Sequence, residues 1–414
     1  YNPLSRPLFM NLLVEDASLA NTVPFLKFGL GDGGDLLVNS VGYVPIPADI
    51  QATMEARLDA ATHGGDDTID VGTVVCGPDG SISIAGSSTV LPLAEAWAEY
   101  YTEACEGVTI TVESGGSSSG AGRVCANSAK GTPVDIGDMS RDWKDTERTI
   151  DEDGYTMECL VGDTSRSARQ IVVAFDGLSV VMKKGGAAET CVNGMGGLTP
   201  DQLRWMFSAE TAAELVAAGL DMSTVTPNGD NDDSTHKWSE LSANCPDAEI
   251  NLAYPDAASG TYEYFFEAIL HEAPQGFRSG QQSSDDNVLV NALIGDETAI
   301  GYFGYAYYQE NLATLTAAPV QNDAGNMVAP DATTVRDGSY NPLSRPLFMN
   351  LLIDAASLEN TLPFMAYGLF TEMGQDKVGE VGYVSLNDNQ EAQMFLSRYA
   401  YLKGMTAGGN SDIF

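Results

Sequence analysis

Basic residues are scarce in this chain. Its 414 residues include 20 Lys and Arg against 58 Asp and Glu, which gives a formal net charge of -38. Nucleic acids and anionic membrane surfaces bind proteins through Lys and Arg, so this balance argues against both as partners. Long apolar runs are also missing, and none reaches the about 18 residues that a membrane-spanning helix needs. The hydrophobic share of 43% fits a globular protein, and the length suggests two or three units.

Metal-binding cysteine patterns are absent. The six cysteines contain no C-x-x-C pair, which excludes zinc-ribbon and thioredoxin-like sites. An even number of cysteines without metal spacing indicates disulfides formed in an oxidising compartment, so we expect an extracellular or periplasmic protein. Several connectivities are open to six cysteines, and the one that we favour pairs Cys105 with Cys125, Cys191 with Cys245, and Cys76 with Cys159.

Catalytic signatures are few. The stretch from Gly116 to Gly120 satisfies the G-x-S-x-G pattern of a hydrolase nucleophile. However, none of the three histidines, His63, His236 and His271, can be assigned to it together with an acidic partner. We therefore expect a protein that is not an enzyme and that needs no cofactor.

The excess of acidic residues is most simply a solvated surface, with a calcium-linked or halophilic role as the alternative. Asp230, Asp232 and Asp233 place oxygen ligands in one short loop, but without the spacing of an EF-hand. A solvated insertion loop is favoured there over a calcium site.

A long internal repeat organises the chain. Tyr1–Leu13 returns letter for letter as Tyr340–Leu352, and weaker similarity continues to Met54 and Met394. The separation is far longer than the about 20–50 residues of a solenoid repeat, so it has the length of a whole domain. Each copy predicts an extended segment, an apolar strand, a helix and a closing strand or turn, which together are too small to bury a core alone.

The repeat sets the expected domain boundaries. Residues 1–62 are interpreted as the C-terminal segment of a preceding repeat, 63–80 as a linker, 81–400 as the main domain and 401–414 as a linker to a following unit. Within the main domain we expect one lobe from about 81–160 and 335–400 and a second from about 161–334. No signal peptide is visible, and we expect the chain to be a piece of a longer precursor.

Three turns rich in glycine and hydroxyl residues are candidates for anion binding. They are Gly86–Thr89, Ser114–Gly120 and Ser259–Thr261, and each follows an apolar strand-like run and opens a helical pattern. Free backbone N–H groups at a helix start are suited to an oxyanion. Any one of these hydroxyls alone is more simply a helix N-cap. Because ligands of α/β folds bind beyond the carboxyl ends of strands, their joint occurrence favours one shared site.

The chain resembles the PstS family of phosphate receptors from about residue 81 to residue 400. The motifs that carry the resemblance are AGSSTVLPLAEA, SGGSSSGAGRVC, VDIGDMSR, LTPDQLRWMFS, ASGTYEYFFEAI, SSDDNVLVNALIGDETAIGYFGYAYYQEN and YNPLSRPLFM. The resemblance implies an α/β fold of the periplasmic-binding-protein type, similar to type II, in which two lobes joined by two chain crossings enclose a ligand cleft.

The resemblance also implies the ligand residues. Inorganic phosphate would be bound by the three turns through Ser88, Thr89, Val90, Ser117, Ser118, Ser259, Gly260 and Thr261, with Ser140 in a supporting position. Many family members have an aspartate that rejects sulfate where Arg141 stands here, so sulfate rejection is not implied. The arginine that others place before the third turn is replaced by Pro255, which leaves Arg141 or Arg278 to supply the cation. For Arg141, an ion pair with Asp138 or Asp142 is the alternative.

Two functions follow from these features. The first is a non-catalytic phosphate-binding domain, one unit of a tandem array whose neighbouring copies meet head to tail. The alternative is a structural subunit of an extracellular filament built from repeated PstS-like domains, with phosphate binding reduced or lost. The duplicated end favours repetition of the domain in both cases, because an ordinary receptor needs one copy only.

Overall fold

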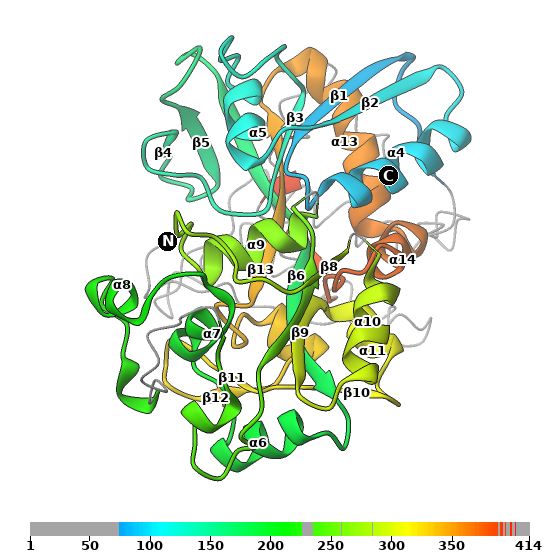
Figure 1. The fold of residues 1–414 in the computed structure, drawn as a ribbon. Helices are drawn as coiled ribbons and strands as arrows, with labels where there is room; N and C mark the ends of the chain where they lie inside the picture. The colour runs from blue at the N-terminus through cyan, green and yellow to red at the C-terminus, as the bar shows by residue number, and fades with distance from the viewer. Residues whose placement is uncertain are drawn as a thin grey trace, which may run out of the picture.

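The computed structural model describes residues 74–225, 235–257, 259–283 and 285–387, with positions 390, 391, 394, 398, 399 and 402. The expected preceding segment 1–62, most of the two linkers, and the loop with Asp230, Asp232 and Asp233 lie outside the described residues. The described residues form two lobes, one above the other in Figure 1. No helix among them is long and apolar enough to span a bilayer.

The upper lobe of Figure 1 contains the first and the last elements of the described chain. Its strands are β1 (Gly80–Gly86), β2 (Val108–Ser114), β3 (Ile136–Met139), β4 (Arg148–Ile150) and β5 (Thr156–Cys159). Its helices are α4 (Leu91–Ala104), α5 (Ser117–Val124), α13 (Ala355–Phe370) and α14 (Glu372–Glu380).

The lower lobe contains the middle of the chain. Its strands are β7 (Asn251–Pro255), β8 (Gln281–Ser283), β9 (Ala299–Gly304), β10 (Leu315–Ala317), β11 (Val320–Gln321) and β12 (Met327–Val328). Its helices are α6 (Ala187–Met195), α7 (Pro200–Phe207), α8 (Ala212–Ala217), α9 (Gly260–Ala268), α10 (Asp286–Gly295), α11 (Tyr305–Glu310) and α12 (Ala332–Arg336), with 3-10 turns at Met222–Thr224 and Trp238–Glu240.

One sheet runs through both lobes in the order β2-β1-β3-β13-β6-β9-β7-β8. The long β6 (Ser167–Lys183) pairs with β13 (Ser344–Leu352) along its first part and with β9 along its last part. β13 also pairs with β3 of the upper lobe. The chain therefore enters the lower lobe along β6 and returns along β13, so these two strands connect the lobes.

The helices α4 and α5 cover opposite faces of the upper sheet. Because β1 lies between β2 and β3, the β1-to-β2 and β2-to-β3 connections run in opposite directions, and right-handed crossovers put their helices on opposite faces. The cores agree with this arrangement. Trp97 of α4 packs in an apolar cluster with Phe364 of α13, whereas Val124 of α5 packs in a different cluster with Met157.

This arrangement corrects two of the expected disulfides. The bonds are Cys76–Cys105, Cys125–Cys159 and Cys191–Cys245. Cys191–Cys245 confirms the prediction, but the pairings of Cys105 with Cys125 and of Cys76 with Cys159 are wrong. Cys105 ends α4 and Cys125 ends α5, so the two thiols belong to cores on opposite faces of the sheet. Each instead bonds to a cysteine on its own face.

The second copy of the repeat forms the return path between the lobes. Its first residues become β13, its helical pattern becomes α13, and Val384 then forms a bridge with Phe175 of β6. The structure has the predicted strand and helix in this copy, but a second helix, α14, follows, and the segment closes with a single bridge in place of a strand. The first copy lies outside the described residues.

Candidate anion-binding site

The first predicted turn lies between β1 and α4. The carbonyl of Ser87 accepts a hydrogen bond from the N–H of Leu91 (3.1 Å), and its hydroxyl accepts one from the N–H of Thr89 (3.2 Å). The N–H of Val90, at the N-cap of α4, donates to no group among the described residues. A free N–H at the start of a helix attracts an anion through the hydrogen bond and the helix dipole.

The second turn lies between β2 and α5. Gly116 adopts a φ of 80°, which a glycine reaches without steric cost, and this lets the chain reverse into α5. The hydroxyl of Ser117 accepts a hydrogen bond from the N–H of Ser140 (3.1 Å) and lies 3.3 Å from the hydroxyl of Ser140. Ser140 in turn accepts from the hydroxyl of Ser87 (2.9 Å). Ser140 thus joins the first two turns.

The third turn comes from the lower lobe. Ser259 caps α9 by accepting a hydrogen bond from the N–H of Thr261 (3.2 Å). Gly260 approaches so closely that an added Cβ would lie 2.6 Å from Oγ1 of Thr89. Across the same boundary, the hydroxyl of Ser88 donates to Glu263 (3.0 Å). The N-termini of α4, α5 and α9 therefore meet between the lobes, and α9 lies at the centre of Figure 1.

The cation beside these turns is Arg345 of β13. Its Nη2 donates to Oγ1 of Thr89 (2.9 Å), and its Nε donates to Oδ2 of the buried Asp176 (3.2 Å). Its guanidinium lies 3.6 Å from the ring centroid of Tyr264 of α9, a cation–π arrangement. Arg345 therefore contacts an element of each lobe while it lies on the strand that connects them.

Two carboxylates lie near this guanidinium. Asp176 is hydrogen-bonded to it, and Oε2 of Glu267 lies 4.0 Å from its Nη1. Burial raises the pKa of both carboxyls, and the charge of Arg345 opposes that rise.

Three hydroxyls of the site each accept a hydrogen bond. Thr89 accepts from Arg345, Ser118 accepts from Nη2 of Arg141 (2.8 Å), and Ser117 accepts from the N–H of Ser140. A hydroxyl that has accepted one hydrogen bond still has its own proton to donate. An oxyanion that accepts these protons and the free helix N–H groups would form charge-assisted hydrogen bonds.

The two arginines expected to supply the cation have other partners. Arg141 lies at the site, where it bonds to Ser118 and forms a two-pronged ion pair with Glu147 (3.0 and 2.9 Å). Its ionic partner is therefore not Asp138 or Asp142. Arg278 does not reach the site. Its Nη2 donates to the carbonyl of Ile250 (3.1 Å), at the end of β7 opposite to the end from which the third turn leaves.

A buried carboxyl lies next to the first turn. Asp138 of β3 is opposite Gly86 in the β1–β3 register, and its carbonyl accepts from the N–H of Ser87 (3.1 Å). No side chain of the described residues pairs with its carboxyl oxygens. Burial raises the pKa of Asp138 to about 8, although the backbone N–H groups of Ser87 and of Asp138 itself lower it. The carboxyl is therefore mostly protonated at pH 7.

Sequence reasoning missed Arg345 and Asp138 as residues of this region. Both stand in motifs that it did quote, YNPLSRPLFM and VDIGDMSR. A signal for Arg345 was available, since it is a charged residue inside an otherwise apolar strand. Such a residue is buried only when it has partners.

Two lobes with a donor-rich site between them define the class of substrate-binding proteins. A sequence model of the PBP superfamily domain matches residues 70–352, and the chain belongs to this superfamily. Within the superfamily it is of the PstS type. Protein SphX of Synechococcus elongatus is 31% identical over 306 residues, which cover 74% of this chain and 77% of that protein. The phosphate-binding protein PstS of Staphylococcus saprophyticus is 26% identical, over 74% of this chain and 81% of that protein.

The fold is also shared with solved structures. A possible phosphate-binding protein from Planctomyces limnophilus superposes with a TM-score of 0.59 at 28% identity, covering 78% of this chain and 99% of that one. The predicted two-lobed α/β fold of the periplasmic-binding-protein type is confirmed. Proteins of this type are binding receptors, so the chain is a binding protein and not an enzyme.

Proposed function

We propose that the chain is a phosphate-binding unit that holds the anion between its two lobes. Two of the similar proteins, PstS of Staphylococcus saprophyticus and the protein from Planctomyces limnophilus, carry phosphate in their names, and the described geometry offers what a tetrahedral oxyanion needs. The ligand residues of the proposal are Thr89, Val90, Ser117, Ser118, Ser259, Gly260 and Thr261, with Ser88, Ser140 and Arg141 at the margin and Arg345 as the cation. Arg278 is left out, because it lies at the other end of β7.

The observation that carries this proposal is the meeting of three helix N-termini between the lobes, with Arg345 in contact with Thr89 before α4 and with Tyr264 of α9. Each N-terminus contributes N–H groups and a positive dipole end, and the arginine adds a full charge. The proposed ligand is anionic although the whole chain is acidic. Hydrogen bonds from neutral donors explain this, because they do not require a basic surface.

Titration calorimetry with inorganic phosphate tests the proposal. The wild-type chain should release heat and saturate with one phosphate per chain. Arg345→Gln should weaken binding by about 10- to 100-fold, since one charge-assisted hydrogen bond is worth about 1.5–3 kcal/mol. Lys377→Gln is the matched control, because Lys377 is a partly exposed residue of α14 that pairs with Glu380. It removes the same charge elsewhere and should bind like the wild type.

Two results would contradict the proposal. One is the absence of heat at millimolar phosphate while circular dichroism shows a folded chain. The other is equal binding by the Arg345 and Lys377 variants, which would mean that the arginine only holds the lobes together.

Secretion and repetition of the unit are further parts of the proposal. Binding proteins of the PstS type are periplasmic or extracellular, and three disulfides suit an oxidising compartment. The identical segments Tyr1–Leu13 and Tyr340–Leu352 support a tandem array in which copies of the domain follow one another head to tail. In the alternative, the same head-to-tail order of domains would build an extracellular filament with a structural role.

Light scattering and negative-stain microscopy on native material test the repetition. Beads joined end to end, with one domain in each bead, would support it. Monodisperse particles of single-chain mass with residues 1–62 open to proteases would refute it. Neither result depends on phosphate affinity, so the array and the binding site are tested separately.

A further inference from the structure

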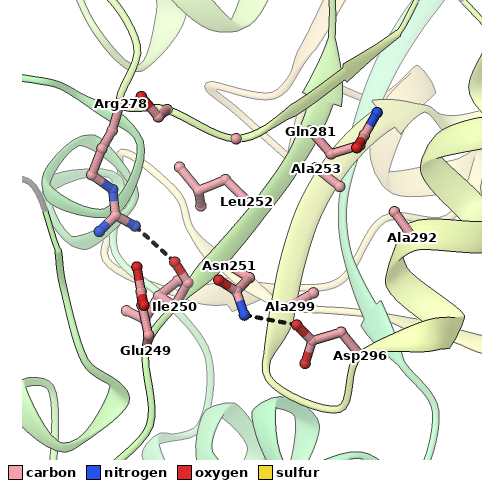
Figure 2. Close-up of a pocket in the computed structure, with 12 residues that line it drawn as sticks. Glu249, Ile250, Asn251, Leu252, Ala253, Arg278, Gln281, Ala292, Asp296 and Ala299 are labelled. Atoms are coloured by element: carbon pink, nitrogen blue, oxygen red, sulfur yellow. Dashed lines mark hydrogen bonds between the residues drawn. The ribbon is translucent and has the colours of Figure 1, made fainter.

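Polar groups around a cavity of the lower lobe are bonded to one another. The cavity has a volume of about 280 Å³ and lies beside the start of β7, away from the third turn. Figure 2 shows Arg278 bonded to the carbonyl of Ile250 and Asn251 bonded to Asp296. Nε of Arg278 has no hydrogen-bond partner among the described residues, but it also has almost no accessible surface. The first turn differs, because the N–H of Val90 donates to none of the described groups although it stands at the start of a helix.

The other side of the same peptide unit is held by Tyr383. The hydroxyl of Tyr383 donates a hydrogen bond to the carbonyl oxygen of Thr89. That carbonyl and the N–H of Val90 belong to one trans peptide unit, so they point in opposite directions. A partner that fixes the carbonyl therefore also fixes the direction of the N–H. Burial raises the pKa of Tyr383, so its hydroxyl keeps its proton and stays a donor.

The backbone of Tyr383 is itself held in place. Its N–H donates to the carbonyl of Val378 in α14 (2.9 Å), and the next residue, Val384, exchanges two hydrogen bonds with Phe175 of β6 (2.8 Å each). Tyr383 thus reaches the first turn from 294 positions along the chain, from a segment tied to a strand that connects the lobes. It belongs to the stretch VGYV at 381–384, which recurs at 41–44.

The remaining groups of Thr89 are also engaged. Its N–H donates to the hydroxyl of Ser87 (3.2 Å), and its Oγ1 accepts from Arg345 (2.9 Å). The helix α4 does not provide such anchors, because the first N–H groups of a helix have no intrahelical partner. The direction of the N–H of Val90 therefore depends on contacts outside α4, and the bond from Tyr383 is the one made to its own peptide unit.

We propose that Tyr383 is a positioning residue of the phosphate site, which holds the peptide unit between Thr89 and Val90 so that the N–H of Val90 faces the bound anion. This inference rests on the proposed function. Loss of the hydroxyl would let the peptide unit rotate, and the hydrogen bond from Val90 to the anion would weaken although no ligand group had been removed.

Calorimetry with inorganic phosphate on the full chain is the first test. Tyr383→Phe should weaken binding by about tenfold, because it impairs one hydrogen bond to a charged group. Tyr101→Phe is the matched control. Tyr101 is buried in the same lobe, and its hydroxyl also donates to a backbone carbonyl, that of Val75 (3.2 Å), but it lies near the other end of α4. This variant should bind phosphate like the wild type.

Nuclear magnetic resonance separates positioning from a role in stability alone. Labelling threonine at its carbonyl carbon and valine at its nitrogen selects the amide groups of Thr-Val peptide units, which include that of Val90. Saturating phosphate should shift one of these resonances strongly in the wild type and in Tyr101→Phe. The shift should be much smaller in Tyr383→Phe, because the N–H no longer points at the anion.

The positioning role is overturned if the wild type binds phosphate and Tyr383→Phe binds it equally tightly or shows the same shift. If Tyr383→Phe does not fold, the wild type decides alone, since phosphate binding without a shift of any Thr-Val amide would also overturn it. A wild type that releases no heat with phosphate would instead contradict the proposed function, so the two failures are distinguishable.

Discussion

Replacing Asp138 by Asn should change how the stability of the protein depends on pH. Burial raises the pKa of this carboxyl from 3.8 to about 8 in the fold, whereas it ionises near 3.8 in the unfolded chain. Between these two values the folded state holds a proton that the unfolded state has lost. As the pH rises through this range, this one group therefore lowers the free energy of unfolding by about 1.4 kcal/mol for each pH unit.

The magnitude follows from that slope. Through this carboxyl, the free energy of unfolding is about 4 kcal/mol lower at pH 7 than at pH 4. An asparagine has no proton to lose, so Asp138→Asn removes the slope, while any packing cost of the amide is the same at every pH. The difference in unfolding free energy between variant and wild type should thus shift by about 3 kcal/mol in favour of the variant from pH 5 to pH 7.

Urea unfolding followed by circular dichroism at pH 5, 6 and 7, with the disulfides intact, measures this difference. Asp176→Asn is a comparison and not a flat control, because burial also raises the pKa of Asp176, although the charge of Arg345 opposes that rise. It should destabilise the protein by about 3–5 kcal/mol, because it leaves a buried charge without its partner. Parallel pH profiles for wild type and Asp138→Asn would refute the reasoning, since they would show that the carboxyl keeps its charge in the folded state.

Three further predictions concern packing and covalent bonds. Gly260→Ala should weaken phosphate binding in calorimetry, because its Cβ would lie 2.6 Å from Oγ1 of Thr89 and would hold the lobes apart; unchanged affinity would contradict this. Cys125→Ser with Cys159→Ser should lower the free energy of unfolding by about 2–4 kcal/mol in a denaturant titration, and a loss below about 1 kcal/mol would count against it. Gly368→Ala should lower the melting temperature, because its Cβ would come within 2.3 Å of a core tryptophan ring, and an unchanged melting temperature would show that α13 can shift.

The sequence predicted the three turns better than it predicted the charges around them. Glycine and hydroxyl residues between a strand and a helix are local features, and in the fold Ser140 joins the first two turns while Gly260 approaches Thr89. Arg345 was missed because its role depends on where β13 inserts into the sheet. That is a contact between residues more than 150 positions apart, as with Asp176, and no local pattern records it.

The errors in the disulfides and in Arg278 have the same origin. Whether Cys105 and Cys125 can meet depends on the face to which each crossover turns its helix, which follows from the strand order and not from spacing along the chain. Arg278 does not reach the three turns because it lies at the opposite end of β7, where it bonds to the carbonyl of Ile250. Strand order and loop direction depend on the whole fold, so local sequence motifs do not predict either of them.

The central place of β13 also has a consequence for how the protein folds during synthesis. β13 lies between β3 and β6, yet it follows them by more than 150 residues in the chain. Until the ribosome has made Leu352, the edges of β3 and β6 that will pair with it are open, and non-local pairing of this kind is slow. In a tandem chain, a β13 segment from a neighbouring copy would fit the same gap. In such a chain, correct folding would depend on each gap being closed by its own strand before the next copy is made.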